Sequence, residues 1–72
     1  MTKKALEKIS GTPYQKTLEY KRKQRKNLEE AGHEQAAESA KASIAGYCQA
    51  LRDCGIITER ERGVLFIYYG TV

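Results

Sequence analysis

Residues 33–54, HEQAAESAKASIAGYCQALRDC, carry the most regular apolar pattern in the chain. Its apolar side chains recur at alternating intervals of three and four residues, which places them on one stripe of a helix: Ala37, Ala40, Ile44, Tyr47, Leu51 and Cys54. Small residues fill the first half of this stripe, so another helix can approach it closely. Gly55 fits the position after the last helical residue, with Ile56 folding back on Leu51. The segment therefore predicts an amphipathic helix that packs against a second helix.

The preceding segment, residues 13–31, has its own helix start. A capping box is predicted from Thr12 as N-cap, Pro13 at the first helical position and Gln15 at the third. No helix breaker follows until Gly32, which leaves two alternatives: a hairpin of two helices, or one helix running through both segments. The single helix would be about 60 Å long, more than a small monomer can cover, so we favour the hairpin.

The tail, residues 56–70, fits two structures. In the first, Thr58 caps a third helix, Glu61 completes a capping box and Gly70 ends the helix. In the second, IIT and VLFIYY pair as a β-hairpin across ERERG, as in a winged helix, because β-branched and aromatic residues crowd the second run. We favour the helix.

The first residues offer a further choice. Residues 2–9, TKKALEKI, form a short helix with Leu6 and Ile9 on one side, or residues 1–11 stay a flexible basic arm. In either case we expect residues 1–72 to make one small all-α domain. It consists of a helical hairpin, a short N-terminal helix or arm, and a C-terminal third helix. A chain of 72 residues is near the size at which a single core is marginal and oligomerisation helps.

The stretch ITERERGVLFIYYG resembles the opening helix of the DNA-binding region 4 of sigma-70-type factors. The matching residues are Ile57, Thr58, Glu59, Arg60, Glu61, Arg62, Val64, Leu65, Ile67, Tyr69 and Gly70. In that family a helix-turn-helix follows, whereas here only Thr71 and Val72 follow, so no DNA contact is carried over to any residue. The longer stretch ALRDCGIITERERGVLFIYY is also similar to the recognition helix and wing of winged-helix repressors, which implies Gln49 and Arg52 as groove-facing residues.

The net charge of +4 is distributed unevenly. Residues 1–28 carry nine Lys or Arg against two Glu, a charge of +7, while residues 29–72 have a charge of −3. This asymmetry predicts a polyanionic partner for one end of the molecule.

The run KRKQRK, residues 21–26, concentrates this charge on the first long helix. Cations on a helix can contact phosphates, and the flanking tyrosines can stack on the bases of a single strand. The candidate nucleic-acid-binding residues are Lys16, Lys21, Arg22, Lys23, Arg25, Lys26, Tyr14 and Tyr20. The alternatives are a solvated helix face, or docking on an acidic protein surface that imitates nucleic acid.

The apolar tail predicts a second contact surface. As a helix, Val64–Tyr69 is apolar on every side, so part of it must meet something besides the hairpin. We expect the core to be completed by Ile56, Ile57, Val64, Leu65 and Tyr68, with Phe66 and Tyr69 reaching a partner. The candidate residues for a homodimer or partner interface are Phe66, Ile67, Tyr68 and Tyr69.

Nothing in the sequence indicates catalysis, a cofactor or a metal site. His33 is the only histidine and is expected at an exposed turn, while Cys48 and Cys54 are best explained as small, buried, reduced side chains. No apolar run approaches the roughly 20 residues of a membrane span, and the first residues lack a signal-peptide core, so we expect a cytoplasmic protein.

These patterns predict a small, non-enzymatic regulatory or accessory protein that binds DNA or RNA through its basic helix. The runner-up is a protein-binding inhibitor of the kind phages and mobile elements encode against a host polymerase or a CRISPR-type nuclease. A structural subunit of a larger assembly is the third possibility.

Overall fold

The computed structural model describes residues 2–72, and over this range the chain forms helices and no strand. The four helices are α1 (Thr2–Ile9), α2 (Pro13–Glu30), α3 (Glu34–Asp53) and α4 (Glu59–Gly70). The all-α prediction is therefore confirmed, and the alternative of a C-terminal β-hairpin is wrong.

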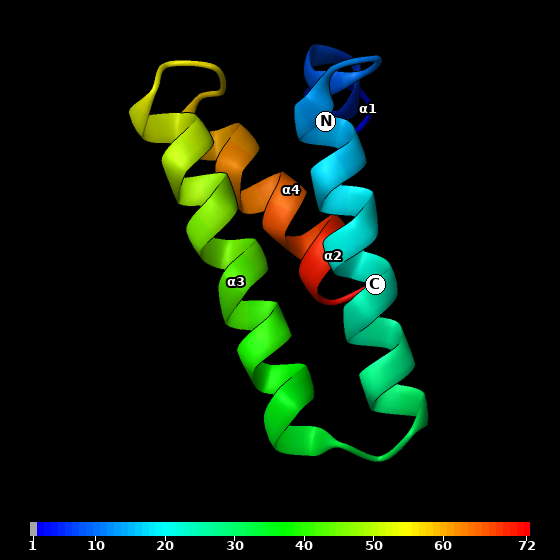
Figure 1. The fold of residues 1–72 in the computed structure, drawn as a ribbon. Helices are drawn as coiled ribbons and strands as arrows, with labels where there is room; N and C mark the ends of the chain where they lie inside the picture. The colour runs from blue at the N-terminus through cyan, green and yellow to red at the C-terminus, as the bar shows by residue number, and fades with distance from the viewer. Residues whose placement is uncertain (1) are drawn as a thin grey trace.

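Helices α2 and α3 lie side by side as an antiparallel hairpin (Figure 1). Gly32 has a φ of +78°, the left-handed conformation that glycine adopts without a Cβ clash. Its N–H donates to the carbonyl of Glu29 at 3.1 Å, and the N–H of His33 donates to that of Leu28 at 3.0 Å. These two bonds close α2 at Glu30, one residue before the predicted end, and confirm the hairpin over the single long helix.

The end of α3 follows the same motif. The N–H of Gly55 donates to the carbonyl of Arg52 at 2.9 Å, and the N–H of Ile56 donates to that of Leu51 at 3.0 Å. Ile56 is thereby folded back toward the last turn of α3, as its position after the glycine predicts.

Helix α4 starts at the predicted capping box. The hydroxyl of Thr58 accepts from the N–H of Glu61 at 3.2 Å, and the N–H of Thr58 donates to the Glu61 carboxylate at 2.8 Å. The helix ends at Gly70, the residue predicted to end it. The ring of Phe66 lies so close to Gly70 that a Cβ there would be 2.9 Å from the ring, so packing explains this glycine.

The core lies where α4 crosses the hairpin, with α1 packed against α4 and the start of α2 (Figure 1). All four helices and the loop before α4 contribute to it. Its buried members are Ala5, Ile9, Leu18, Ile44, Cys48, Leu51, Ile57, Leu65 and Tyr69. The N-terminal segment is thus a helix whose inner side belongs to the core.

The tail completes the core largely as expected, with one correction. Ile57 and Leu65 are buried, and Val64 and Tyr68 pack against the core while half-buried. Tyr69, however, was expected to reach a partner and is only 2% exposed, because its side of α4 faces the hairpin.

Both cysteines were predicted to be buried, and the structure agrees for only one of them. Cys48 is fully buried, whereas Cys54, which the apolar stripe included, is exposed. Ile44, Cys48 and Leu51 are spaced by four and three residues, and this line faces inward once α4 packs on α3.

Candidate functional site

The basic run of α2 is divided by the packing of the helix. Of the six candidate cations on this helix, Lys16, Lys23 and Lys26 are exposed. The other three, Lys21, Arg22 and Arg25, turn toward neighbouring helices. Lys21 donates to the hydroxyl of Ser43 on α3 at 2.7 Å, and its Nζ lies 5.8 Å from the ring of Tyr47. The run is therefore not one continuous phosphate-binding surface.

Arg25 is a buried structural residue, contrary to its predicted place among the exposed ligand contacts. It is 2% exposed, and its Nε donates to the backbone carbonyl of Tyr69 at 3.2 Å. Its Nη1 donates to both carboxylate oxygens of Glu29 at 2.9 Å. Two of its three guanidinium nitrogens thus have acceptors, which favours burial beside the end of α4, while Nη2 is buried without a hydrogen-bond partner among the described residues.

Arg22 links α2 to α4 at the surface. Its guanidinium carbon lies 4.7 Å from the centre of the Tyr68 ring, a distance typical of a cation–π contact. Both side chains are half-buried, so one side of this stacked pair remains open to solvent.

The two tyrosines predicted to stack on bases are in different environments. Tyr14 is half-buried against the core, while Tyr20 is 63% exposed and accepts a hydrogen bond from Gln24 at 3.0 Å. Exposed Glu19 and Glu30 lie among the lysines on the outer face of α2, so this face has a mixed charge.

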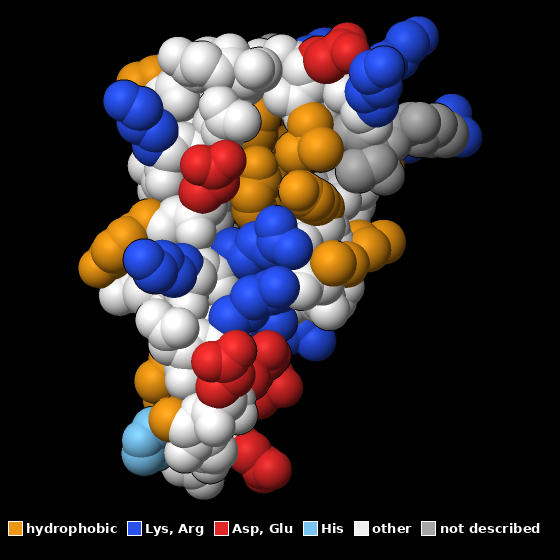
Figure 2. Space-filling view, turned by 90° about the vertical axis from the view of Figure 1, so that its right-hand side faces the viewer, with side chains coloured by type: hydrophobic (Ala, Val, Ile, Leu, Met, Phe, Trp, Pro, Cys, Tyr) orange, Lys and Arg blue, Asp and Glu red, His pale blue; other side chains and the backbone are white. Residues whose placement is uncertain are grey.

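The end of α4 presents an apolar surface beside the stacked pair. Val64, Ile67, Tyr68 and Val72 line one depression, which we call the α4 patch. Ile67 and Val72 are each 58% exposed. On α2, Arg22, Lys23 and Lys26, which we call the basic cluster, line a second depression together with Glu19, Asn27 and Glu30. Figure 2 shows blue side chains grouped on this face, with orange ones above them and red ones below.

A third depression continues the α4 patch toward α1. It is lined by Lys4, Arg60 and Val64, together with the capping box of α4. Lys8 bonds to Glu61 at 2.8 Å and, with the Thr58 backbone, lowers the pKa of the Glu61 carboxyl, so this carboxylate is already engaged. Cations thus flank the α4 patch on both sides.

The sequence predicts only part of this face. Ile67 and Tyr68 were predicted, and Phe66 is half-buried against the core. Val72 and Lys4 were not predicted. Val72 follows the end of α4 and lines a depression with residues of that helix, while Lys4 lies beside α4 because α1 packs against it. No local sequence pattern predicts the packing of α1 on α4.

The two thiols are in different environments. Burial raises the pKa of Cys48 to about 11, against a smaller lowering by the nearby Arg62, so the thiol is protonated at neutral pH. Cys54 is exposed at the end of α3. Within residues 2–72, no group of three His, Cys, Asp or Glu side chains is placed to hold a metal ion.

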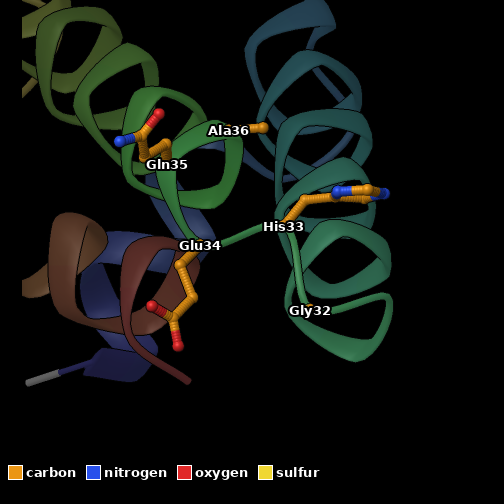
Figure 3. Close-up of a pocket in the computed structure, with 5 residues that line it drawn as sticks. All are labelled: Gly32, His33, Glu34, Gln35 and Ala36. Carbon is orange, nitrogen blue, oxygen red and sulfur yellow. The ribbon is translucent and has the colours of Figure 1, made fainter.

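The turn between α2 and α3 forms a shallow open pocket lined by Gly32, His33, Glu34, Gln35 and Ala36. Figure 3 shows that the imidazole, the carboxylate and the amide point away from one another. These polar groups do not converge on a common point, so the pocket has no arrangement for a ligand.

Comparison of the chain with models of protein families, with curated protein sequences and with solved structures finds no match. The resemblance of residues 57–70 to sigma-70 region 4 therefore rests on the sequence alone. None of the described helices is long and apolar enough to cross a membrane.

Proposed function

We propose that this protein is a small, non-enzymatic regulatory protein that binds another protein through the α4 patch and the basic cluster. The observation that carries the proposal is the exposure of Ile67 and Val72 directly beside the Arg22–Tyr68 stack. Single exposed apolar residues are ordinary, but here they line one depression. Aromatic residues and arginine at the centre of a patch, with charges around it, are typical of protein interfaces.

The chemistry of the face defines the partner. An apolar side chain would enter the α4 patch, and carboxylates beside it would meet Arg22, Lys23 and Lys26. An amphipathic helix with an acidic flank has both features, spaced at intervals of three and four residues. The charges would raise the association rate and select acidic partners, while the apolar contact would hold the complex together. This arrangement suits an inhibitor or adaptor that occupies an acidic site on its target.

Nucleic-acid binding is the second candidate, supported by a separate observation. Lys16, Lys23 and Lys26 are all exposed on the outer side of α2, and the exposed ring of Tyr20 is on the same helix. The glutamates among these lysines reduce the local positive charge, so few phosphates would be neutralised. We expect any such binding to be weak and strongly dependent on salt.

The test compares three labelled probes by fluorescence anisotropy: an acidic amphipathic helical peptide, single-stranded RNA and duplex DNA. Ile67→Glu places a charge in the α4 patch, and Lys16→Ala removes an exposed cation outside the patch and the basic cluster. If the face binds protein, Ile67→Glu lowers the affinity for the peptide at least about tenfold, equivalent to about 1.4 kcal/mol, while Lys16→Ala leaves it nearly unchanged.

The matched control is Ala36→Glu, which adds the same charge at an exposed position at the hairpin turn. Loss of affinity in both glutamate variants would indicate a general charge effect and contradict the proposed face. Binding of RNA or DNA but not of the peptide, with a loss in Lys16→Ala, would favour the second candidate.

A further inference from the structure

The α4 patch continues along the helix toward its first turn. Val64 lines both the patch and the depression that lies toward α1, so the two depressions adjoin on one side of α4. Arg60, Val64 and Tyr68 follow one another at intervals of four residues, which places them in one row on this helix. The row is exposed at Arg60 and half-buried at Val64 and Tyr68. One surface therefore extends over about two turns of α4.

Each end of this surface carries cations that have no carboxylate partner in the protein. At the first end, Lys4 of α1 and Arg60 of α4 line a depression of about 230 Å³. At the second end, Arg22 of α2 stacks on the ring of Tyr68. None of these three cations forms an ion pair within residues 2–72. The surface is thus an apolar strip between two groups of cations that come from three different helices.

The carboxylates near the first end are already engaged. Glu61 lines the depression there, but its carboxylate accepts from Lys8 at 2.8 Å and from the N–H of Thr58 at 2.8 Å. Glu59, at the start of α4, forms an ion pair with Arg62 at 2.7 Å. The cations that line this depression therefore remain available to a carboxylate from another molecule.

The charges at the second end are less uniform. Glu19 and Glu30 line the depression of the basic cluster together with its cations. Arg22 is the member of that cluster whose guanidinium lies against the α4 patch, at 4.7 Å from the centre of the Tyr68 ring. We therefore assign the contact at this end to Arg22.

The distance between the two ends sets the spacing of the acidic groups that would fit them. Arg60 and Tyr68 are eight residues apart, which is about 12 Å along the axis of α4. A partner helix that lies along α4 has the same rise per residue, so carboxylates about seven or eight positions apart would meet both ends. An apolar side chain about midway between them would then lie over Val64 and Ile67.

We propose that the partner segment is an amphipathic helix with an acidic residue at each end of its apolar side, docked along α4. One acid binds Lys4 and Arg60, the other binds Arg22, and an apolar residue between them enters the α4 patch. This inference rests on the proposed function and deepens it, because the first turn of α4 becomes part of a second carboxylate-binding site. The spacing of the acids is then the feature by which the partner is selected.

Fluorescence anisotropy on the full chain, in about 0.05 M salt, tests this with labelled helical peptides of identical length, net charge and apolar residues. In the spaced peptide, a pair of glutamates lies about eight positions apart with a leucine between them. In the clustered peptide, both glutamates lie within one turn at one end of the leucine. The spaced peptide should bind at least about fivefold more tightly, equivalent to about 1 kcal/mol, because it alone engages the cations at both ends.

Arg60→Glu reverses a charge at the first end, at an exposed position of α4. It should weaken binding of the spaced peptide at least about fivefold. The matched control, Lys16→Glu, changes the net charge equally at an exposed position of α2 outside this surface, and should weaken binding less than about twofold. Circular dichroism confirms that both variants are folded.

Charge reversal in the peptide gives the complementary test. Two further peptides each carry a lysine in place of one of the spaced glutamates. One of them should bind Arg60→Glu more tightly than it binds the wild type, because its lysine meets the new carboxylate. The identity of that peptide gives the direction in which the partner helix runs along α4.

Equal affinities for the spaced and the clustered peptides overturn the inference, and so do equal losses in Arg60→Glu and Lys16→Glu. In either case the proposed function stands if Ile67→Glu still weakens peptide binding, because that variant tests the α4 patch alone. If none of the peptides binds, the proposed function fails together with this inference.

Discussion

Arg25 was predicted to contact nucleic acid at the surface, but in the structure it is buried and connects two helices. Arg25 lies on the same side of α2 as Tyr14 and Leu18. From the sequence alone, a charged residue on this apolar side is hard to explain. The structure explains it, because the carbonyl of Tyr69 at the end of α4 and the carboxylate of Glu29 accept from the guanidinium. Arg25 thereby connects two helices and satisfies one of the terminal carbonyls that α4 leaves without an intrahelical donor.

Arg25→Ala should lower the free energy of unfolding by about 2–3 kcal/mol, since it removes charge-assisted hydrogen bonds and a buried aliphatic stem. A chain of 72 residues has a total stability of about 4–11 kcal/mol, so this loss is large. Urea unfolding followed by circular dichroism measures it. Lys26→Ala, one position along on the exposed side, should change the value by less than about 0.5 kcal/mol. Equal losses in both variants would show that Arg25 has no special role.

The buried thiol of Cys48 predicts a dependence of stability on alkaline pH. Its pKa is raised to about 11 from an ordinary value near 9, so the unfolded chain loses this proton at lower pH than the folded one. The contribution of this thiol to the free energy of unfolding is therefore fully present below about pH 9, and it is lost as the pH rises through about 11. Burial also raises the pKa of Tyr69, which acts in the same direction.

Urea unfolding at about pH 7, 9 and 11 should show this decline in the wild type. Cys48→Ala should reduce the decline, although it lowers stability at every pH by leaving a small cavity. Cys54→Ala is the control, because that residue is exposed and should leave the decline unchanged. A decline of the same size in all three proteins would contradict the assignment.

At the scale of the element, α4 demonstrates that a local cap can outweigh composition. Val64–Tyr69 is rich in β-branched and aromatic residues, which favour strands. The capping box of Thr58 and Glu61 nonetheless starts a helix, and Gly55 and Ile56 close α3 shortly before it. A strand here could pair only with the short IIT run, whereas a helix bonds all along its own backbone.

Thr58→Ala should lower the free energy of unfolding by about 1 kcal/mol, the usual contribution of an N-cap side chain. Thr58→Ser keeps the hydroxyl and should stay within about 0.5 kcal/mol of the wild type. Thermal unfolding followed by circular dichroism compares the three proteins. If the alanine and serine variants are equally destabilised, the methyl group of Thr58 matters and the cap does not.

At the scale of the whole molecule, the fold is a hairpin that is covered along only part of its length. The molecule measures 34 × 20 × 20 Å, and its buried residues gather where α1 and α4 cover the hairpin. The long helices supply few large apolar side chains, so α4 provides a substantial part of the core. Its remaining side forms the α4 patch, and the uncovered end of the hairpin exposes the glutamates.

A chain ended after Gly63 should not fold at 25 °C. It lacks the buried side chains of Leu65 and Tyr69, each worth about 1.5–3 kcal/mol, and also Val64, Phe66 and Tyr68, which pack against the core. Together these losses are comparable to the whole stability of so small a domain. A chain ended after Gly70 lacks only exposed Thr71 and Val72 and should remain folded. Proton NMR spectra distinguish the two. A shorter chain with dispersed signals and cooperative unfolding would show that α4 is dispensable.

The sequence by itself determined where the caps and turns of the helices lie. Thr12, Gly32, Gly55 and Thr58 are local signals whose caps and turns involve residues within a few positions, so their effects can be predicted without knowing the fold. The apolar spacing in α3 similarly identified its inner side, apart from Cys54, which is exposed.

Only the tertiary structure decided which cations and tyrosines remain at the surface. Arg25 contacts a backbone oxygen 44 positions away, and Arg22 stacks on Tyr68 of the same distant helix. Whether such side chains are buried depends on the path of α4 across the hairpin, which is set by the combined packing of four helices. Periodicity within one helix gives the side on which a residue lies, but not what covers that side.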